Sequence, residues 1–336
     1  GAEPVATVRA LQAFEFNAAT GEMRASDTGR DLFGIVLHGV PMAWAKPWLD
    51  AVAVSGDKVR GELVAVAQAG GVSVRTTVPL TLEQVGVAQA GQALLKDVNV
   101  SLDLAGDYTP KGWQVEISDL TLKSGSATLL RVDAKAGQLA GTAQPLKATG
   151  RLVSSLPAVL GQPVAEGVIV LTSGDAAVDF VVSSGGQHQV QATIALSGLA
   201  TIADKHAVEL PNVSAEMRAD IDADGRITFN LPLILSRQER KSDLTVIGSV
   251  GPEKDKSRAI DAQVTSAQFV VDDAKLFAAL VPVKDRKREE GTSNSPLPPW
   301  AGVHGTLGLQ LGRVIYSDAF EVTHLSGQLR IEAGMV

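Results

Sequence analysis

The sequence has no cysteine, few aromatic residues and no long apolar run. The absence of cysteine excludes disulfides, thiol nucleophiles and Cys-ligated zinc. No apolar stretch approaches the ~20 residues that a membrane-spanning helix needs, and the start lacks the charged and apolar regions of a signal peptide. Aromatic residues make up 4% of the chain, so any core has to be built from Val, Leu, Ile and Ala.

The chain also lacks an excess of positive charge. Its formal net charge is −7, whereas a nucleic-acid surface needs clustered Lys and Arg. We therefore expect no nucleic-acid partner. Because the chain starts at Gly1 and ends at Val336, directly after a strand pattern, we expect it to be a piece of a longer protein.

What the sequence does contain is alternation of apolar and polar residues. In the stretch 95–105, LKDVNVSLDLA, Val98, Val100, Leu102 and Leu104 alternate with polar residues. Successive strand side chains face opposite sides, so this pattern predicts a strand with one apolar face. Similar stretches follow one another with short connections, for example across Gly70-Gly71. This favours an antiparallel meander over β-α-β units.

A related pattern recurs at domain-sized spacing. Leu95 and Leu210 begin similar stretches and are 115 residues apart, which suggests a repeated β unit. The sequence therefore predicts four segments: a β entry segment at 1–41, a first β repeat unit at 42–153, a second at 154–271, and a helix, charged linker and truncated third unit at 272–336.

Three short helical inserts precede runs of strands, near residues 42, 154 and 272. The first places Trp44 and Trp48 on one helix face, with Pro47 limiting its length. The third, at 272–281, carries the apolar stripe Leu276, Phe277 and Leu280 and has acidic residues at its start. These five side chains either cap the sheet or line and gate an apolar groove.

Motifs that would indicate catalysis or metal binding are weak. Ser55 and Lys58 have an S-x-x-K spacing, but they lie in a Gly/Asp turn and the companion motifs are missing. The five histidines do not have metal-ligand spacing. We therefore expect no enzyme activity, no catalytic residue, no metal and no cofactor. The basic run at 284–288 is interpreted mainly as part of a solvated linker.

The last part of the chain resembles the AsmA-like superfamily. The residues that carry this resemblance are 303–316, VHGTLGLQLGRVIY, and 320–334, FEVTHLSGQLRIEAG, preceded by the short helix and a Pro-containing spacer. In that superfamily a GRVIY-like turn leads to a Thr-x-Leu-x-Gly-x-Leu-Arg-Ile strand. The charged linker at 284–299 departs from the family pattern, and the family's membrane anchor is absent from this sequence.

The resemblance implies a mainly β fold: an elongated, curved antiparallel sheet made of repeated meander units with short helical inserts. Members such as the TamB-like and YdbH-like proteins are periplasmic, anchored in the inner membrane, and linked to phospholipid transport and outer-membrane assembly. It therefore implies an apolar groove for phospholipid or another acyl lipid, with outer-membrane partners. We expect the groove lining to be Val72, Val74, Val78, Leu80, Val98, Val100, Leu102, Leu104, Ile227, Phe229, Leu231 and Leu233.

Two other interpretations remain open. In the first, the chain is a structural or adhesive β repeat whose apolar faces form a closed core without a ligand. In the second, Ser55, Lys58 and histidines assemble a hydrolase site across strands. The number of sheet layers distinguishes a lipid groove from a closed core, because a single open layer leaves one apolar face for a ligand.

Overall fold

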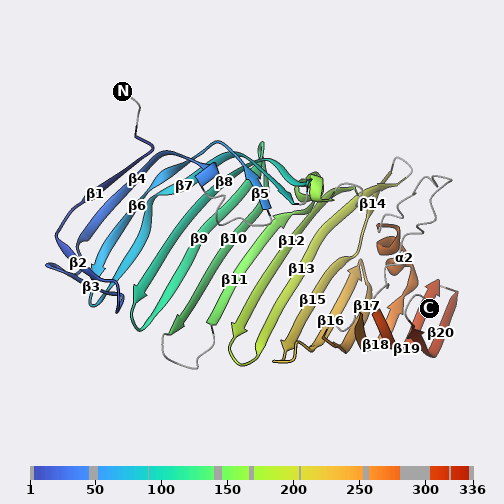
Figure 1. Ribbon diagram of the computed structural model, residues 1–336. Coiled ribbons are helices and arrows are strands. Elements are labelled where there is room, and N and C mark those ends of the chain that lie inside the picture. Colours follow the sequence, from blue (N-terminus) through green and yellow to red (C-terminus); the bar gives the residue numbers. More distant parts are fainter. Residues whose placement is uncertain are drawn as a thin grey trace, which may run out of the picture. The chain divides into compact units, whose positions relative to one another are not determined.

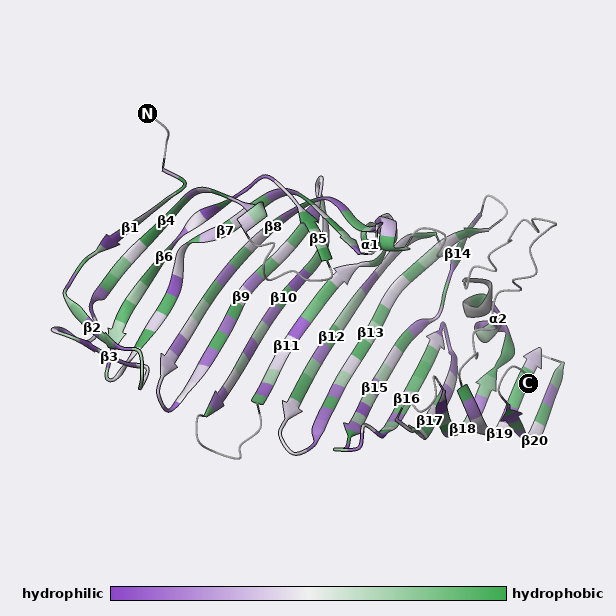
Figure 2. Ribbon diagram, in the orientation of Figure 1, coloured by the Kyte–Doolittle hydropathy of each residue, from purple (hydrophilic) through white to green (hydrophobic). Residues whose placement is uncertain are grey.

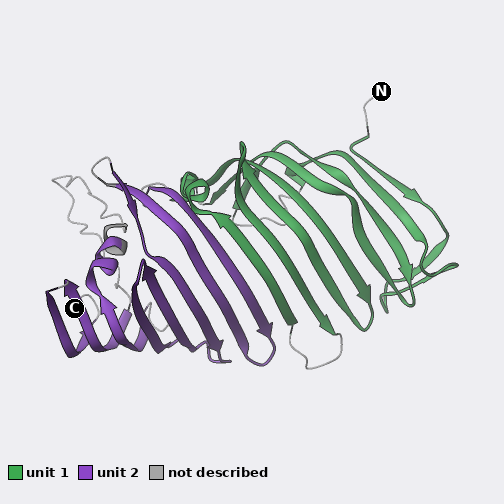
Figure 3. Cartoon of the chain, turned by 180° about the vertical axis from the view of Figure 1, so that it is seen from behind, with its two compact units in different colours: residues 1–166 green, residues 167–336 purple. Residues whose placement is uncertain are grey.

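A computed structural model describes residues 4–44, 52–89, 91–139, 146–165, 170–203, 206–252, 257–280, 303–317 and 319–332. The chain is mainly β, as predicted. It consists of two compact units, unit 1 at residues 1–166 and unit 2 at residues 167–336 (Figure 3). Each unit is described by itself.

In its described residues, unit 1 contains eleven strands, two short helical segments and a 3-10 turn at 42–44 (Figure 1). The elements are β1 (Ala6–Ala10), β2 (Phe14–Asn17), β3 (Glu22–Ala25), β4 (Asp31–Pro41), β5 (Val52–Ser55), β6 (Lys58–Gln68), β7 (Gly71–Gln89), β8 (Gln92–Thr109), β9 (Gly112–Ser124), β10 (Ala127–Leu139), β11 (Leu146–Ser155), α1 (Leu156–Leu160) and the 3-10 helix η2 (Pro163–Ala165).

The main sheet of unit 1 is an antiparallel meander. Its strands pair in the order β1, β4, β6, β7, β8, β9, β10 and β11, with β5 beside β7. Among the described residues, no pairing joins β1 to β11, so the sheet of this unit is open. Strands β2 and β3 form a separate hairpin.

Unit 2 contains a second meander. Its elements are β12 (Leu171–Ser184), β13 (His188–Ala203), β14 (His206–Glu209), β15 (Asn212–Ile221), β16 (Ile227–Arg237), β17 (Arg240–Val250), β18 (Arg258–Val270), α2 (Val271–Leu280), β19 (Val303–Ser317) and β20 (Phe320–Ile331). The strands pair in the order β12, β13, β15, β16, β17, β18, β19 and β20, with β14 beside β13.

One connection in unit 2 departs from the expected antiparallel pattern. Strands β18 and β19 are parallel, and α2 lies between them in sequence. Parallel neighbours need a crossover, usually helical, because the chain has to return to the starting end of the sheet. The prediction of an antiparallel meander in place of β-α-β units was therefore wrong at this one connection. The helix predicted at 272–281 is the element that makes the crossover possible.

The sheet of each unit is a single layer. Apart from paired strands, the main contacts between described elements are those of η2 with β8, α1 with β10 and β11, α2 with β19, and β3 with β6 and β7. Among the described strands, β2 and β3 alone stand apart from the main sheets, and β3 contacts β6 and β7 at one end of unit 1 (Figure 1).

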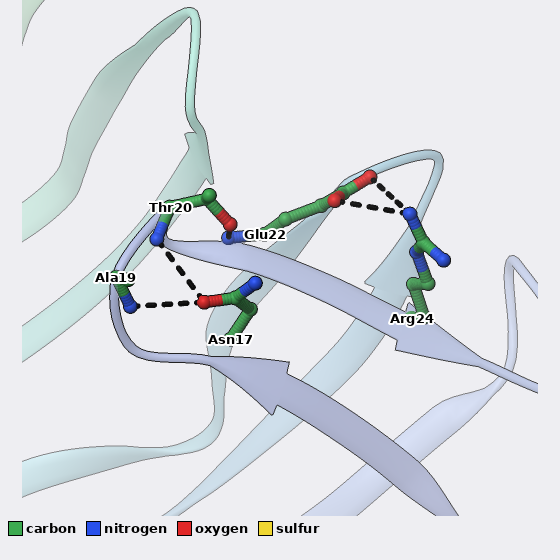
Figure 4. A network of polar contacts seen from close by, with 5 residues as sticks. All are labelled: Asn17, Ala19, Thr20, Glu22 and Arg24. Atoms are coloured by element: carbon green, nitrogen blue, oxygen red, sulfur yellow. Dashed lines mark hydrogen bonds and ion pairs between the residues drawn. The ribbon is translucent and has the colours of Figure 1, made fainter.

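The β2–β3 hairpin is held by its turn. Asn17 Oδ1 accepts hydrogen bonds from the backbone N–H groups of Ala19 and Thr20, at 3.0 and 3.3 Å, and Arg24 pairs with Glu22 (Figure 4). Where the hairpin leaves the sheet, the Gln12 side chain donates to the carbonyls of Asp27 and Arg30. These bonds tie the two ends of the hairpin together.

The start of α2 in unit 2 is fixed by a buried ion pair. Asp273 lies in the first helical turn, its side chain is 0% exposed, and Arg237 Nε lies 3.1 Å from its Oδ1. No hydrogen bond from a described residue reaches either carboxylate oxygen. The Arg237 guanidinium is therefore the main compensation for burying this charge.

Substituting Arg237→Met is expected to leave the Asp273 carboxylate buried and unpaired. Such changes cost about 3–5 kcal/mol, and urea denaturation measures this loss as a lower midpoint. The matched control is Arg313→Met, which removes an ion pair with Glu321 in which both partners are about half exposed. Because exposed pairs contribute less than ~1 kcal/mol, an equal loss in both variants would contradict this interpretation.

Candidate apolar binding faces

One side of the unit 1 sheet carries aligned apolar residues, and we call it the unit 1 apolar face. Directly opposed residues in antiparallel strands point to the same side, so the register identifies its members. One row across the sheet consists of Ala10, Phe33, Ala65, Val74, Gly106, Val115, Ala136 and Ala148. A second row consists of Leu80, Leu102, Leu120, Val132 and Leu152.

Unit 2 has a matching unit 2 apolar face. A row of opposed residues crosses all eight strands of its meander: Val182, Val190, Ala219, Phe229, Gly248, Ala262, Leu307 and Leu329. Alternating hydrophobic and hydrophilic bands follow the strands in Figure 2. The apolar stripes of separate strands are therefore in register.

Most sequence-predicted lining residues lie on these faces. In unit 1 these are Val72, Val74, Leu80, Val98, Val100, Leu102 and Leu104. In unit 2, Ile227, Phe229, Leu231 and Leu233 alternate along β16 and are half-buried, whereas Thr228 and Asn230 between them are exposed. The structure brings members of different strands together within each unit.

Val78 is an exception: it is among the residues predicted to line the groove, but it does not lie on the unit 1 apolar face. Val78 pairs with Glu62, whereas Thr76 pairs with the next residue, Leu63. This bulge turns Val78 to the opposite side, where it is 45% exposed. Pro79 follows directly. Proline has no N–H to donate and is found in sheets at edges or bulges, so it was the available sequence signal.

The two ends of the unit 1 apolar face are covered. At one end, Met23 and Ala25 of β3 pack with Ala65, Val72 and other residues around the buried Leu32. At the other end, Ala158 and Val159 of α1 pack around Val98, which is 0% exposed.

The cover made by α1 and η2 is anchored by polar contacts. Ser154 Oγ donates to the Leu129 carbonyl at 2.8 Å, and Gln162 Oε1 accepts the N–H of Lys96 at 2.9 Å. Neither buried cluster includes Leu80, Leu102 or Leu104. These half-buried residues therefore form the open middle of the unit 1 apolar face.

The other side of the unit 2 sheet is polar. One row consists of Ser183, Gln189, Asp220, Thr228, Ser249, Asp261, Thr306 and Arg330. Large apolar residues on this side are more exposed than those of the apolar face; Ile234 is 46% and Ile247 53% exposed. Two shallow hollows over the polar side of unit 2 have volumes of about 510 and 400 Å³.

The five residues predicted to cap the sheet or gate a groove differ in where they lie and in how far they are described. Trp44 is 58% exposed at the end of a 3-10 turn at 42–44, and Trp48 lies outside the described residues. Leu276 is half-buried in α2. Phe277 and Leu280 belong to α2, but their side chains lie outside the described part of the chain.

The S-x-x-K stretch forms a turn between strands. Ser55 ends β5 and donates its hydroxyl to the Gly86 carbonyl at 3.4 Å, and Lys58 begins β6. Within the described ranges, no group of three or more His, Asp or Glu side chains is placed to hold a metal ion. The basic run at 284–288 lies outside these ranges.

Lys275 connects α2 to β19. Its Nζ lies 4.1 Å from the ring centre of Tyr316, and Asp272 Oδ1 is 3.5 Å away. The hydrogen bond with Tyr316 raises the pKa of the Lys275 ammonium. Lys275 thus links the first turns of α2 to the end of β19.

No protein family, curated protein or solved structure matches the chain in comparisons with known proteins. Over the described residues, no helix is long and apolar enough to cross a membrane.

We expect the same substitution to change the free energy of unfolding differently at the buried Val98 and at the exposed Val78. Val98→Ala is expected to lower the free energy of unfolding by about 2 kcal/mol, because it opens space beneath α1. Val78→Ala is expected to change it by less than ~0.5 kcal/mol, because Val78 is exposed. Denaturant titration of both variants measures the difference, and similar losses would contradict the assignment of faces.

Proposed function

We propose that the chain is a non-enzymatic segment of a cell-envelope protein that holds the acyl chains of phospholipids on its two apolar faces. The observation that carries this proposal is the in-register apolar surface of each unit, of which the middle part in unit 1 is left uncovered by the described elements. Burying an acyl CH₂ group contributes about 0.8 kcal/mol. An uncovered face of aligned Val, Leu and Ala side chains is a surface on which this contribution is available.

The dimensions of one unit suit an acyl chain. Neighbouring strands lie about 4.8 Å apart, so eight strands extend about 34 Å across the sheet. A bilayer core of about 30 Å contains two layers of acyl chains, each about 15 Å long. One acyl chain therefore needs only three or four neighbouring strands, such as β7 to β10 with Leu80, Leu102, Leu120 and Val132.

The resemblance of residues 303–334 to the AsmA-like superfamily supports a periplasmic setting. On this proposal the chain is part of a longer protein anchored in the inner membrane, and it works in lipid transfer or outer-membrane assembly with outer-membrane partners. A closed structural repeat is less well supported, because the buried clusters of unit 1 lie under the small β2–β3 sheet and under α1, which cover only the two ends of the unit 1 apolar face.

The experiment is mass spectrometry of organic extracts of the purified protein, with adjacent residues as a matched pair of variants. Leu231→Glu places a charge on the unit 2 apolar face, whereas Asn230→Glu places it on the polar side of the same strand. We expect the wild type and Asn230→Glu to carry phospholipid or fatty acid, and Leu231→Glu to carry several-fold less.

The unit 1 apolar face is tested by Leu102→Glu, with Ser101→Glu on the opposite side as its control. Circular dichroism has to show that all four variants fold. If Leu102→Glu and Leu231→Glu unfold the protein, their faces are core. A wild-type extract without lipid would reject the proposal.

A further inference from the structure

A third hollow lies at the strand ends of unit 1, on the side of the sheet opposite the unit 1 apolar face, which we call the polar side of unit 1. Its volume is about 640 Å³, and it sits where the β8–β9 turn meets β10 and β11. Register places Gly137 between Gln114 of β9 and Lys147 of β11, with Lys135 beside Thr149 in the next polar row. Because Gly137 has no side chain, the backbone of β10 forms the floor of the hollow and the neighbouring side chains form its walls.

The charge of this hollow is opposite to that of the other two. Its lining carries three lysines, Lys111, Lys135 and Lys147, against one carboxylate, Asp107. The formal charge is therefore +2, in a chain whose net charge is −7. The hollows of unit 2 each have one arginine and two carboxylates, which gives −1.

Two of the three lysines in the hollow can still pair with an anionic ligand. Lys135 is paired with Glu116 at 2.9 Å, and Asp107 accepts a hydrogen bond from Gln68 at 2.8 Å. Lys111 and Lys147 have no ion pair with any residue in the described part of the chain. Thr109, Gln114 and Thr149 contribute neutral hydrogen-bonding groups to the same lining.

We propose that this hollow binds a phosphate group, held between the ammonium groups of Lys111 and Lys147. Lysine ammonium groups are compact point charges with three donors each and bind phosphate oxygens through charge-assisted hydrogen bonds. The bare backbone at Gly137 provides room for the phosphate. This binding does not require that the apolar faces hold lipid.

The phosphate comes from a phospholipid headgroup or from a free phosphate ester. The position of the hollow connects it to the lipid source. Tyr108 and Trp113 pair at the same strand ends and point to the unit 1 apolar face, where both are partly exposed. A phospholipid at this edge has its acyl chains on the apolar face and its phosphate at the lysines. This lipid source, unlike the phosphate site itself, rests on the proposed function.

Calorimetric titration tests the site with three probes: inorganic phosphate, dihexanoyl phosphatidylglycerol and dihexanoyl phosphatidylcholine, each lipid below its micelle concentration. We expect phosphatidylglycerol to bind the wild type. The double variant Lys111→Gln, Lys147→Gln should bind about tenfold or more weakly, because two charge-assisted hydrogen-bonding partners are lost. Lys123→Gln, an exposed lysine on the same side of β9 and outside the hollow, is the matched control and should bind like the wild type.

The results distinguish a lipid headgroup from a free phosphate ester as the ligand. They also test the phosphate site separately from the proposed lipid-binding function. Binding of inorganic phosphate as tight as that of phosphatidylglycerol, lost in the double variant, assigns the site to free phosphate esters. Tighter binding of the lipid assigns it to a headgroup. Failure of every probe, or equal affinities in the double variant and the control, overturns the site. Bound lipid in the organic extracts of the wild type would leave the proposed function intact in that case.

Discussion

The structure depends on a constraint of antiparallel pairing: residues directly opposite each other share a side of the sheet. Strands such as β8 and β16 have a period-2 apolar pattern of their own, but a surface arises only when neighbouring strands are in register. A slip by one residue would move all apolar side chains of a strand to the polar side. The rows through Val74 and through Phe229 show that this register is kept across each unit.

The bulges and covers follow from this constraint. Strand β7, with 19 residues, contains the bulge that turns Val78 away from the unit 1 apolar face. Gly61 lies opposite, where a Cβ would come within 2.8 Å of the Pro79 carbonyl oxygen. The irregular pairing is thus accommodated by a residue without a side chain. Beyond it, Leu80 returns to the apolar face and the row continues through Leu102.

Individual strands, helices and their apolar faces could be predicted from the sequence, whereas much of the pairing between them could not. Alternation at 95–105 and 227–235 identified β8 and β16 and the side to which their apolar residues point. The helix after residue 271 was also predicted from its apolar stripe. These are local properties of a few consecutive residues, determined by the geometry of a strand or a helix.

Pairing between distant segments was not available from local patterns. The bulge at Val78 depends on how many residues β6 and β7 place opposite each other, and the parallel pairing of β18 with β19 depends on the course of the chain after α2. The predicted lining list also missed Leu120, Val132 and Val246, although each occupies an alternating position. Only the register shows that they continue the rows of Leu102 and Leu231.

The same register explains why the two sides of unit 1 differ in what they can bind. Alternation sends Val115 and Ala136 to one side of β9 and β10 and sends Gln114 and Gly137 to the other. The apolar side is smooth because small residues such as Gly106, Ala136 and Ala148 align in a row. The polar side is hollow where Gly137 faces Lys147. An amphiphile at the strand ends therefore meets apolar surface and cationic groups only a sheet thickness apart, which is the chemical contrast between its acyl chains and its headgroup.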